Sequence, residues 1–218
     1  MFLLINRSAE CGVQGAEWPA IVPCTRHIAR LLLLLATAIF SSCSEKQPVT
    51  QHSFYNIDSL VDRQVQTLKS SKYELNKVVE IGGKQEQTHL TPDSTQWATE
   101  LEVFRQLAQV NKAAFRDAYV VSDMRDTNSN LTVREIRAQR PVPVSLVRLY
   151  YLRTPADLRK VEATFVEENE VYTNTRQMVL ELERFSNGNL LRRYRVKSLQ
   201  KFMMDDTVRF VIAGSVEL

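Results

Sequence analysis

From about Tyr119 to the C-terminus, the chain alternates between strand-length segments and short turns, and this pattern limits the possible folds more than any other feature. Pro141 and Pro143 separate two of these segments, and Asn187-Gly188 is typical of a tight hairpin. Consecutive strands joined by short turns predict an antiparallel β-meander with one apolar face. The expected strands cover residues 131–139, 144–152, 158–166, 171–185, 190–202 and 207–218.

Two helices are expected before this meander. Apolar residues recur at helical spacing over residues 54–68, with polar residues between them. A second helix begins after Asp93, which can cap it together with Gln96 three positions later. Between the helices, Gly82-Gly83 predicts the turn of a β-hairpin. The fold class is therefore α+β, an antiparallel β-meander sheet with two N-terminal helices packed on one face.

The strands and the second helix offer many bulky residues for a core between the helices and the sheet. Side chains of this size tend to fill such a space to the density of a normal protein interior. We therefore expect a packed core rather than an apolar cavity of the kind that a lipid carrier needs. The residues expected to point inward are Leu146, Tyr150, Leu152, Phe165, Met178, Leu180, Leu182, Tyr194, Phe210 and Ile212, with Trp97, Leu101 and Phe104 from the helix.

The apolar run at residues 31–40 is too short to span a bilayer, which takes about 20 residues. Arg26 and Arg30 stand just before it, and a basic segment followed by an apolar one is typical of a secretory signal peptide. We therefore expect residues 1–42 to be a leader that is removed. Because residues 1–25 are long and partly acidic for such a leader, we expect the true start near Val22.

The end of this leader, Phe40-Ser41-Ser42-Cys43, resembles the lipobox of bacterial lipoproteins. The resemblance implies acylation of Cys43, and two or three acyl chains anchor a protein stably to a membrane. Ser44 resembles the signal that sorts lipoproteins to the outer membrane of other bacteria. Cleavage after Ala36-Thr37-Ala38 is the alternative, but Cys43 would then remain as a lone free thiol.

The order of elements resembles that of small envelope lipoproteins of the Bacteroidota, which are largely uncharacterised. The resemblance implies a leader, residues 43–52 as lipidated cysteine and tether, and residues 53–218 as a single α+β domain. It implies a location in the cell envelope and carries over no catalytic residue.

The charge balance gives no reason to expect binding to nucleic acid. The leader holds three of the 28 Lys and Arg residues and two of the 25 Asp and Glu residues. The rest of the chain therefore has only two more basic than acidic side chains, whereas nucleic-acid binding needs a clustered basic face. The expected partners are the membrane, through the lipid, and another envelope protein.

No arrangement of residues after the leader is typical of an enzyme or a metal site. His52 and His89 stand apart, without the spacing of zinc ligands. Residues 126–130 begin like a calcium loop, but Leu131 and Arg137 stand where that loop needs Gly and Glu. We expect no cofactor and a non-enzymatic binding or structural role. An envelope hydrolase is the alternative, with Glu167, Glu168, Glu170, Asp205 and Asp206 as its only candidates.

One basic segment stands out, in the strand expected at 190–202. Arg193, Arg195 and Lys197 share one face of that strand, whereas Arg192 is expected to point with Leu190 and Tyr194. The two glutamates expected to pair with these cations across the hairpin are Glu181 and Glu183. The functional alternative to such pairing is contact with an anionic surface, such as lipid headgroups or lipopolysaccharide.

Overall fold

The computed structural model describes residues 54–70, 72–185, 188–203 and 207–217. The predicted leader, the tether with Cys43, the turn residue Asn187, and the carboxylates Asp205 and Asp206 lie outside the described residues.

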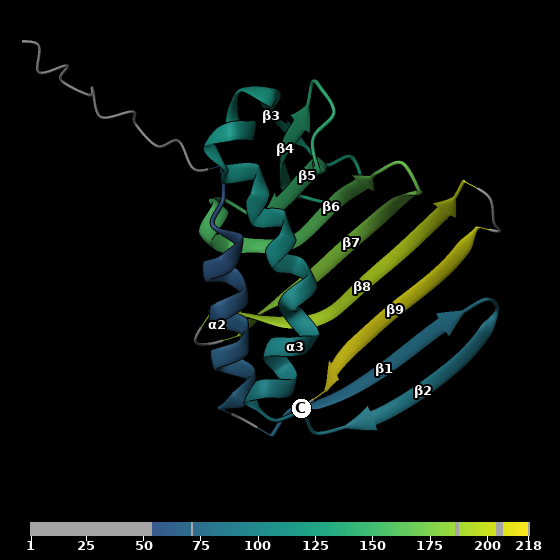
Figure 1. Cartoon of the computed structure of the whole chain (residues 1–218). Coiled ribbons are helices and arrows are strands. Elements are labelled where there is room, and N and C mark those ends of the chain that lie inside the picture. Colours follow the sequence, from purple (N-terminus) through teal and green to yellow (C-terminus); the bar gives the residue numbers. More distant parts are fainter. Residues whose placement is uncertain (1–53, 71, 186–187, 204–206, 218) are drawn as a thin grey trace, which may run out of the picture. The chain divides into compact units, whose positions relative to one another are not determined.

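The described chain forms an open antiparallel sheet of nine strands with a few helices, which agrees with the antiparallel sheet of the predicted fold (Figure 1). The strand order is β2-β1-β9-β8-β7-β6-β5-β4-β3. Strands β3 to β8 each pair with the next strand along the chain, which is the predicted meander. The strands are β1 (Glu74–Ile81), β2 (Lys84–Leu90), β3 (Tyr119–Arg125), β4 (Thr132–Ala138), β5 (Val144–Tyr151), β6 (Leu158–Glu168), β7 (Tyr172–Phe185), β8 (Gly188–Phe202) and β9 (Val208–Glu217).

The β1–β2 hairpin continues the sheet past the last strand of the meander. Gly82 and Gly83 form its turn with φ angles of 56° and 80°, which only glycine adopts without strain. Leu75 of β1 lies opposite Val216 of β9. The N-terminal hairpin and the C-terminal strand are therefore neighbours in the sheet (Figure 1).

Two α-helices carry the caps that their sequences require. In α2 (Ile57–Lys69), the Asn56 side chain accepts a hydrogen bond from the backbone N–H of Ser59 at 2.9 Å. In α3 (Ser94–Arg105), Asp93 and Gln96 form the predicted capping box, with both hydrogen bonds at 2.8 Å. Two 3₁₀ helices, η2 (Gln106–Asn111) and η3 (Ala113–Ala118), then lead into β3.

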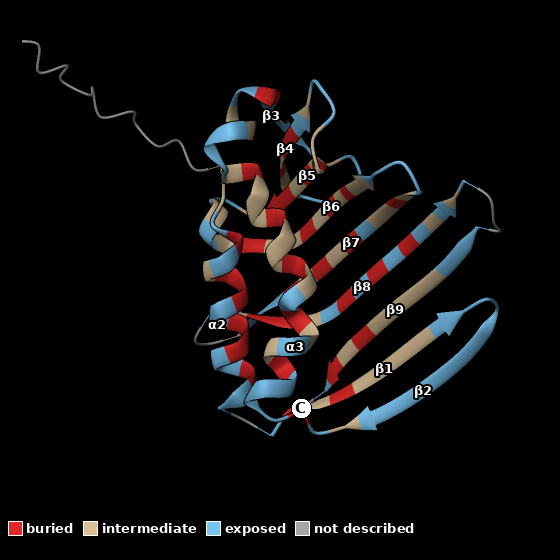
Figure 2. Cartoon of the chain, in the orientation of Figure 1, coloured by how far each residue is buried: buried red, intermediate tan, exposed pale blue. Residues whose placement is uncertain are grey.

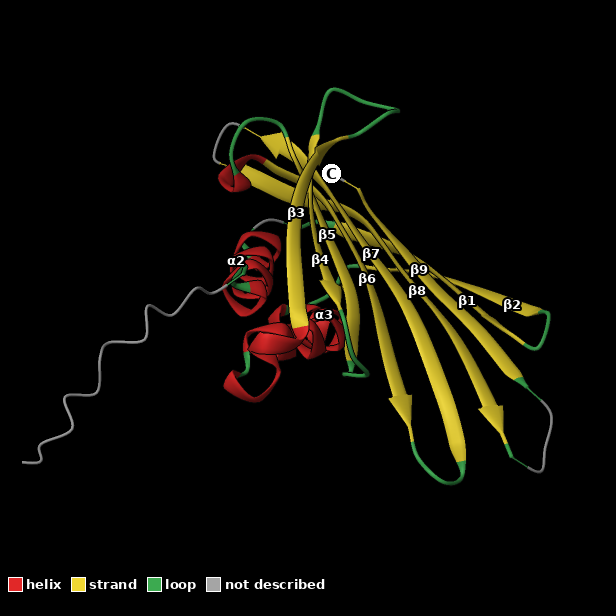
Figure 3. Cartoon of the chain, turned by 90° about the horizontal axis from the view of Figure 1, so that it is seen from above, coloured by secondary structure: helices red, strands yellow, loops and turns green. Residues whose placement is uncertain are grey.

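The helices pack against one face of the sheet, here called the inner face (Figures 2 and 3). The Gln64 side chain of α2 is buried, donates to the carbonyl of Asn189 and accepts from the N–H of Leu191, so α2 is bound directly to β8. The largest fully buried side chains are Trp97, Phe104, Ile57, Leu68, Leu75, Leu101, Leu107, Ile136, Leu149, Leu158, Met178 and Leu190.

Strand β5 corrects part of the predicted core. The prediction placed Leu146 and Tyr150 on the inner face, but the residues that join the helix-covered core are Val147, Leu149 and Tyr151. The reason is that β5 is apolar on both faces, so its period-two pattern does not indicate which face is covered.

Strand β8 requires a second correction. The pairing of β7 with β8 shifts between Glu181 and Leu182, which inserts one extra residue, Arg192, into β8. Leu190 and Leu191 are consequently both buried, so the strict alternation predicted for residues 190–194 does not hold. Arg192 Nε lies 2.9 Å from Glu183 Oε2, which is one of the ion pairs predicted across the hairpin.

Candidate functional site

The three predicted cations of β8 lie on the outer face of the sheet, opposite the helices. Arg193, Arg195 and Lys197 are exposed, whereas Tyr194 and Val196 between them are buried on the inner face. The extended backbone of a strand sends successive side chains to opposite faces, so all three cations point away from α2 and α3.

The neighbouring strands place mostly small or neutral side chains beside these cations. Arg195 lies opposite Val179 of β7 and Ala213 of β9. Lys197 lies opposite Gln177 and Val211 in the same way. The short side chains leave the outer face hollow on both sides of β8.

A groove of about 420 Å³ occupies this hollow and crosses five strands, from β6 to β1. Val78, Val179, Ala213 and Ser215 give it small side chains. Its charged residues are three cations and two carboxylates, namely Lys160, Arg193, Arg195, Glu162 and Glu181. The groove therefore carries an excess of one positive charge.

A second, smaller groove of about 290 Å³ lies farther along β7, β8 and β9. Lys197, Leu199 and Arg209 are among its residues. Because Lys197 follows Arg195 on the same face of β8, the two grooves together form one continuous basic and partly apolar surface.

The charges of the two grooves differ in whether they have partners. Arg193 Nε lies 3.3 Å from Glu181 Oε2, and the Lys160 Nζ lies 2.7 Å from Glu162 Oε1. Within residues 54–217 as far as they are described, Arg195 and Lys197 form neither an ion pair nor a side-chain hydrogen bond. These two neighbouring cations of β8 therefore have unused binding capacity.

Glu162 belongs to a polar cluster that extends from the groove toward β5. The Tyr150 hydroxyl donates to Glu162 Oε2 at 2.7 Å, and the Lys160 Nζ lies 4.3 Å from the centre of the Tyr150 ring. Burial opposes ionisation of Glu162, but hydrogen bonds from Lys160 and Tyr150 outweigh it and lower the pKa of this carboxyl. Burial and the same contact raise the pKa of Tyr150 to about 12.

Beneath the groove, Tyr194 ties β8 to helix α3. Its ring lies over Gly214, where an added Cβ would come within 2.2 Å of the ring. Its hydroxyl donates to Glu100 of α3, and Glu100 also pairs with Lys77 of β1 at 2.8 Å. Burial, followed by the contact with Glu100, raises the pKa of Tyr194. The strands that carry the groove are therefore held from the inner side.

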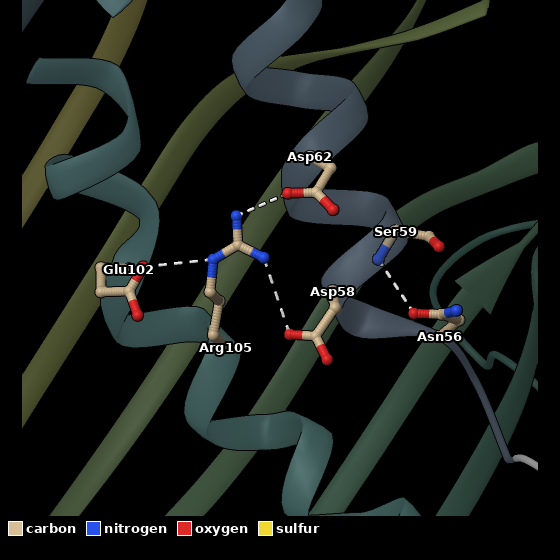
Figure 4. Close-up of polar contacts among 6 residues, drawn as sticks. All are labelled: Asn56, Asp58, Ser59, Asp62, Glu102 and Arg105. Carbon is tan, nitrogen blue, oxygen red and sulfur yellow. Dashed lines mark hydrogen bonds and ion pairs between the residues drawn. The ribbon is translucent and has the colours of Figure 1, made fainter. Parts of the chain in front are cut away.

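A second charged cluster lies on the helix side of the domain, where Arg105 meets three carboxylates (Figure 4). The distances from its guanidinium are 2.6 Å to Asp62, 3.1 Å to Glu102 and 3.7 Å to Asp58. The hydrogen bond with Asp62 raises the pKa of Arg105. Because two of the carboxylates come from α2 and the third from α3, this cluster joins the two helices.

The carboxylates considered for a hydrolase are not gathered by the fold. Glu167 accepts hydrogen bonds from Tyr172 and Arg176, and Glu168 lies beside a separate groove at the β4–β5 connection. Glu170 is exposed in the turn between β6 and β7. Glu162 and Glu181 share the first groove, and each faces a cation. Glu181 was predicted as a partner of the β8 cations, whereas Glu162 was not recognised from the sequence.

The described residues hold neither a metal-binding cluster nor a membrane-spanning helix. Across the described ranges of the chain, no group of three or more His, Cys, Asp or Glu side chains has the geometry to hold a metal ion. Within those same ranges, no helix has the length and apolar character needed to cross a bilayer. The calcium-like segment forms the turn between β3 and β4, where the Ser129 hydroxyl donates to Asp126.

The outer-face grooves are therefore the strongest candidate for a site, and their chemistry is that of binding an anionic or mixed-charge surface. No protein-family model, no curated protein and no solved structure matches this chain.

Proposed function

We propose that this chain is a lipid-anchored protein of the bacterial cell envelope that binds an acidic segment of another envelope protein and catalyses no reaction. The observation that carries the binding proposal is the pair Arg195 and Lys197, which extend from β8 beside the grooves without a partner in the described part of the chain. An acidic side chain placed between them would supply the missing ion pairs.

The mixed charge of the first groove favours a polypeptide as its ligand. Glu162 and Glu181 stand among the cations, and they would repel a polyphosphate or a densely anionic headgroup. A polypeptide can offer both signs of charge together with apolar side chains that fit against Val179 and Ala213. With helices on the inner face, the outer face remains open for such a partner.

The alternative of a lipid carrier with an apolar cavity has less support. A carrier needs free space between the helices and the sheet, and in this domain Trp97, Leu101 and Phe104 of α3 are buried there against sheet residues such as Leu149 and Met178. This filling supports a scaffold role for the helices.

The binding proposal can be tested with a photo-crosslinking amino acid at Ser215, which lies in the first groove. In the cells that make the protein, we expect an adduct with one partner protein, and its yield should fall as ionic strength rises. Replacing Arg195 and Lys197 together by Glu should remove the adduct. The matched control is Arg125→Glu, an exposed cation on the edge strand β3, which should leave the yield unchanged. Persistence of the adduct in the double variant would contradict the proposal.

The anchor can be tested separately by labelling cells with a palmitate analogue. We expect label on the wild-type protein and on Cys24→Ala, whose cysteine lies in the predicted leader. Cys43→Ala should carry none, because the acylated thiol has been removed. Label retained on Cys43→Ala would show that the anchor is elsewhere.

A further inference from the structure

Two exposed apolar side chains lie next to each other at the tips of neighbouring hairpins. Val171, in the β6–β7 turn, is 64% exposed, and Met203, just after β8, is 79% exposed. The backbone N–H of Met203 donates to the carbonyl of Val171 at 3.0 Å, so the two tips are in direct contact. Behind them, the rings of Tyr172 and Phe202 lie 6.1 Å apart. Together these four residues form what we call the apolar tip.

The first described residue of the chain lies at the same end of the sheet. Phe54, the first described residue, donates its backbone N–H to Asn111 at 2.9 Å, and its ring lies 5.7 Å from that of Tyr119. Tyr119 begins β3 and lies opposite Ala138, the last residue of β4. In an antiparallel meander, the end of β4 lies at the same edge as the ends of β6 and β8, which is where the apolar tip is found.

Backbone hydrogen bonds connect this edge from β3 to the apolar tip. The N–H of Gln139 donates to Ala118 at 2.7 Å, and the N–H of Val166 donates to Pro143 at 2.7 Å. The contact between Val171 and Met203 is the next in the series. The edge is thus a continuous rim of turns, with Phe54 beside β3 and the apolar tip at β6–β8.

The length of the tether allows both ends of this rim to reach one membrane. Strands are spaced about 4.8 Å apart, so the five steps from β3 to β8 span roughly 24 Å. Residues 44–53 separate the acylation site from Phe54 and can span up to about 33 Å when extended. The apolar tip therefore lies within reach of the bilayer that holds Cys43.

We propose that Val171 and Met203 insert into the lipid surface to which the chain is anchored, so that the strands stand on the membrane with their turns downward. The proposal rests on the proposed lipid anchor at Cys43. Apolar side chains beside aromatic rings are typical of residues at the boundary between water and lipid. Glu168 and Glu170 lie beside Val171 and would be repelled by anionic headgroups, so the expected surface is a zwitterionic one.

The test uses the mature lipidated protein in vesicles of phosphatidylcholine and phosphatidylethanolamine. A fluorophore is attached at Lys201→Cys, next to the apolar tip, or at Asn128→Cys, in the β3–β4 turn at the opposite end of the sheet. Because Cys43 is acylated, the introduced thiol is the one that reacts. Lipids that carry a nitroxide near the headgroup quench a fluorophore that lies at the membrane surface. We expect severalfold stronger quenching at position 201 than at position 128.

Flotation and quenching distinguish the lipid anchor from insertion of the apolar tip. Flotation with the vesicles reports the anchor alone, and its loss would contradict the proposed function. In the background Val171→Asp with Met203→Asp, we expect quenching at position 201 to fall to the level of position 128 while flotation is unchanged. Equal weak quenching at both positions in the otherwise wild-type anchored protein would overturn the inference and assign the apolar tip to a protein partner. Strong quenching that survives both Asp substitutions would overturn it as well.

Discussion

The two halves of the outer face carry similar charged residues but satisfy them differently. On β4 to β6, Glu135 is only 7% exposed and accepts hydrogen bonds from both Arg137 and Arg148 at 2.7 Å. On β7 to β9, Arg195 and Lys197 face side chains that cannot pair with them. The strands that lie beside each charge, and not the charge itself, decide whether it stabilises the fold or remains available for a ligand.

The difference follows from the register of the strands. Across β4, β5 and β6, Glu135 lies opposite Arg148, and Arg148 lies opposite Glu162, so the sign alternates along one row. The same row continues into β7 and β8 with Val179 and Arg195, and the alternation ends there. This comparison predicts that substituting the paired charges of the first half changes stability, whereas substituting Arg195 or Lys197 in the second half changes binding.

The largest effect is expected just beneath the groove half, at Gly214. Replacing Gly214 by Ala places a methyl group against the ring of Tyr194, which is 3% exposed and bound to Glu100. Because neither ring nor backbone can move freely there, we expect a loss of about 1–3 kcal/mol in the free energy of unfolding, measured in urea. Ala213→Gly, next in the strand but on the outer face, is the control and should cost less. A cost equal to that of the control would mean that the groove half is loosely packed.

The next effect should come from the paired half. Glu135→Gln keeps the shape of the side chain but removes the charge that Arg137 and Arg148 contact, and both arginines are partly exposed. We expect a loss of about 1–2 kcal/mol, because hydrogen bonds to charged groups contribute more than neutral ones. Glu183→Gln breaks the more exposed pair with Arg192 and should cost less than about 0.5 kcal/mol. Equal costs would remove the distinction between the halves.

The sequence predicted the local elements well because each has its own chemical signal. The capping box at Asp93 and the Gly82-Gly83 turn are set by neighbouring residues, and both are present. Pairing between β1 and β9 joins residues about 140 positions apart, as at Asn76 and Ser215, and no local signal indicates it. The groove between β6 and β1 depends on that pairing, so its full set of residues was not predictable.

The cations of the site were predictable, but their surroundings were not. Alternation along β8 places Arg193, Arg195 and Lys197 on one face, which a period of two indicates directly. The bulge at Arg192 was missed because nothing in the sequence of β8 distinguishes an inserted residue from a paired one. Glu162 was missed because its neighbours in space come from three different strands.

The dependence of stability on pH should also distinguish the two halves. The hydrogen bond from Arg137, opposed by burial and helped by Arg148, lowers the pKa of Glu135 below its ordinary value of 4.5. The unfolded chain therefore binds a proton more readily, so the stabilisation is complete above pH 4.5 and is lost as pH falls through the lowered pKa. We expect the free energy of unfolding to fall between pH 5 and pH 3, and this fall to be smaller in Glu135→Gln. An identical pH profile in both proteins would contradict the role assigned to Glu135.

The smallest change in stability is expected where the effect on binding is largest. Arg195→Ala removes a cation that has no partner among the described side chains and that follows Arg193 on the same face of β8. Loss of an exposed, unpaired charge changes the free energy of unfolding by less than about 0.5 kcal/mol, and relief of repulsion from neighbouring cations favours a slight gain. Binding should weaken instead, because the acidic group of the partner would leave water without gaining an ion pair with Arg195. Measured together, an unchanged urea midpoint and a lost crosslink at Ser215 would place Arg195 in the interface. A destabilised Arg195→Ala protein would mean that this cation has a structural partner, and that the two halves of the outer face do not differ in the way proposed.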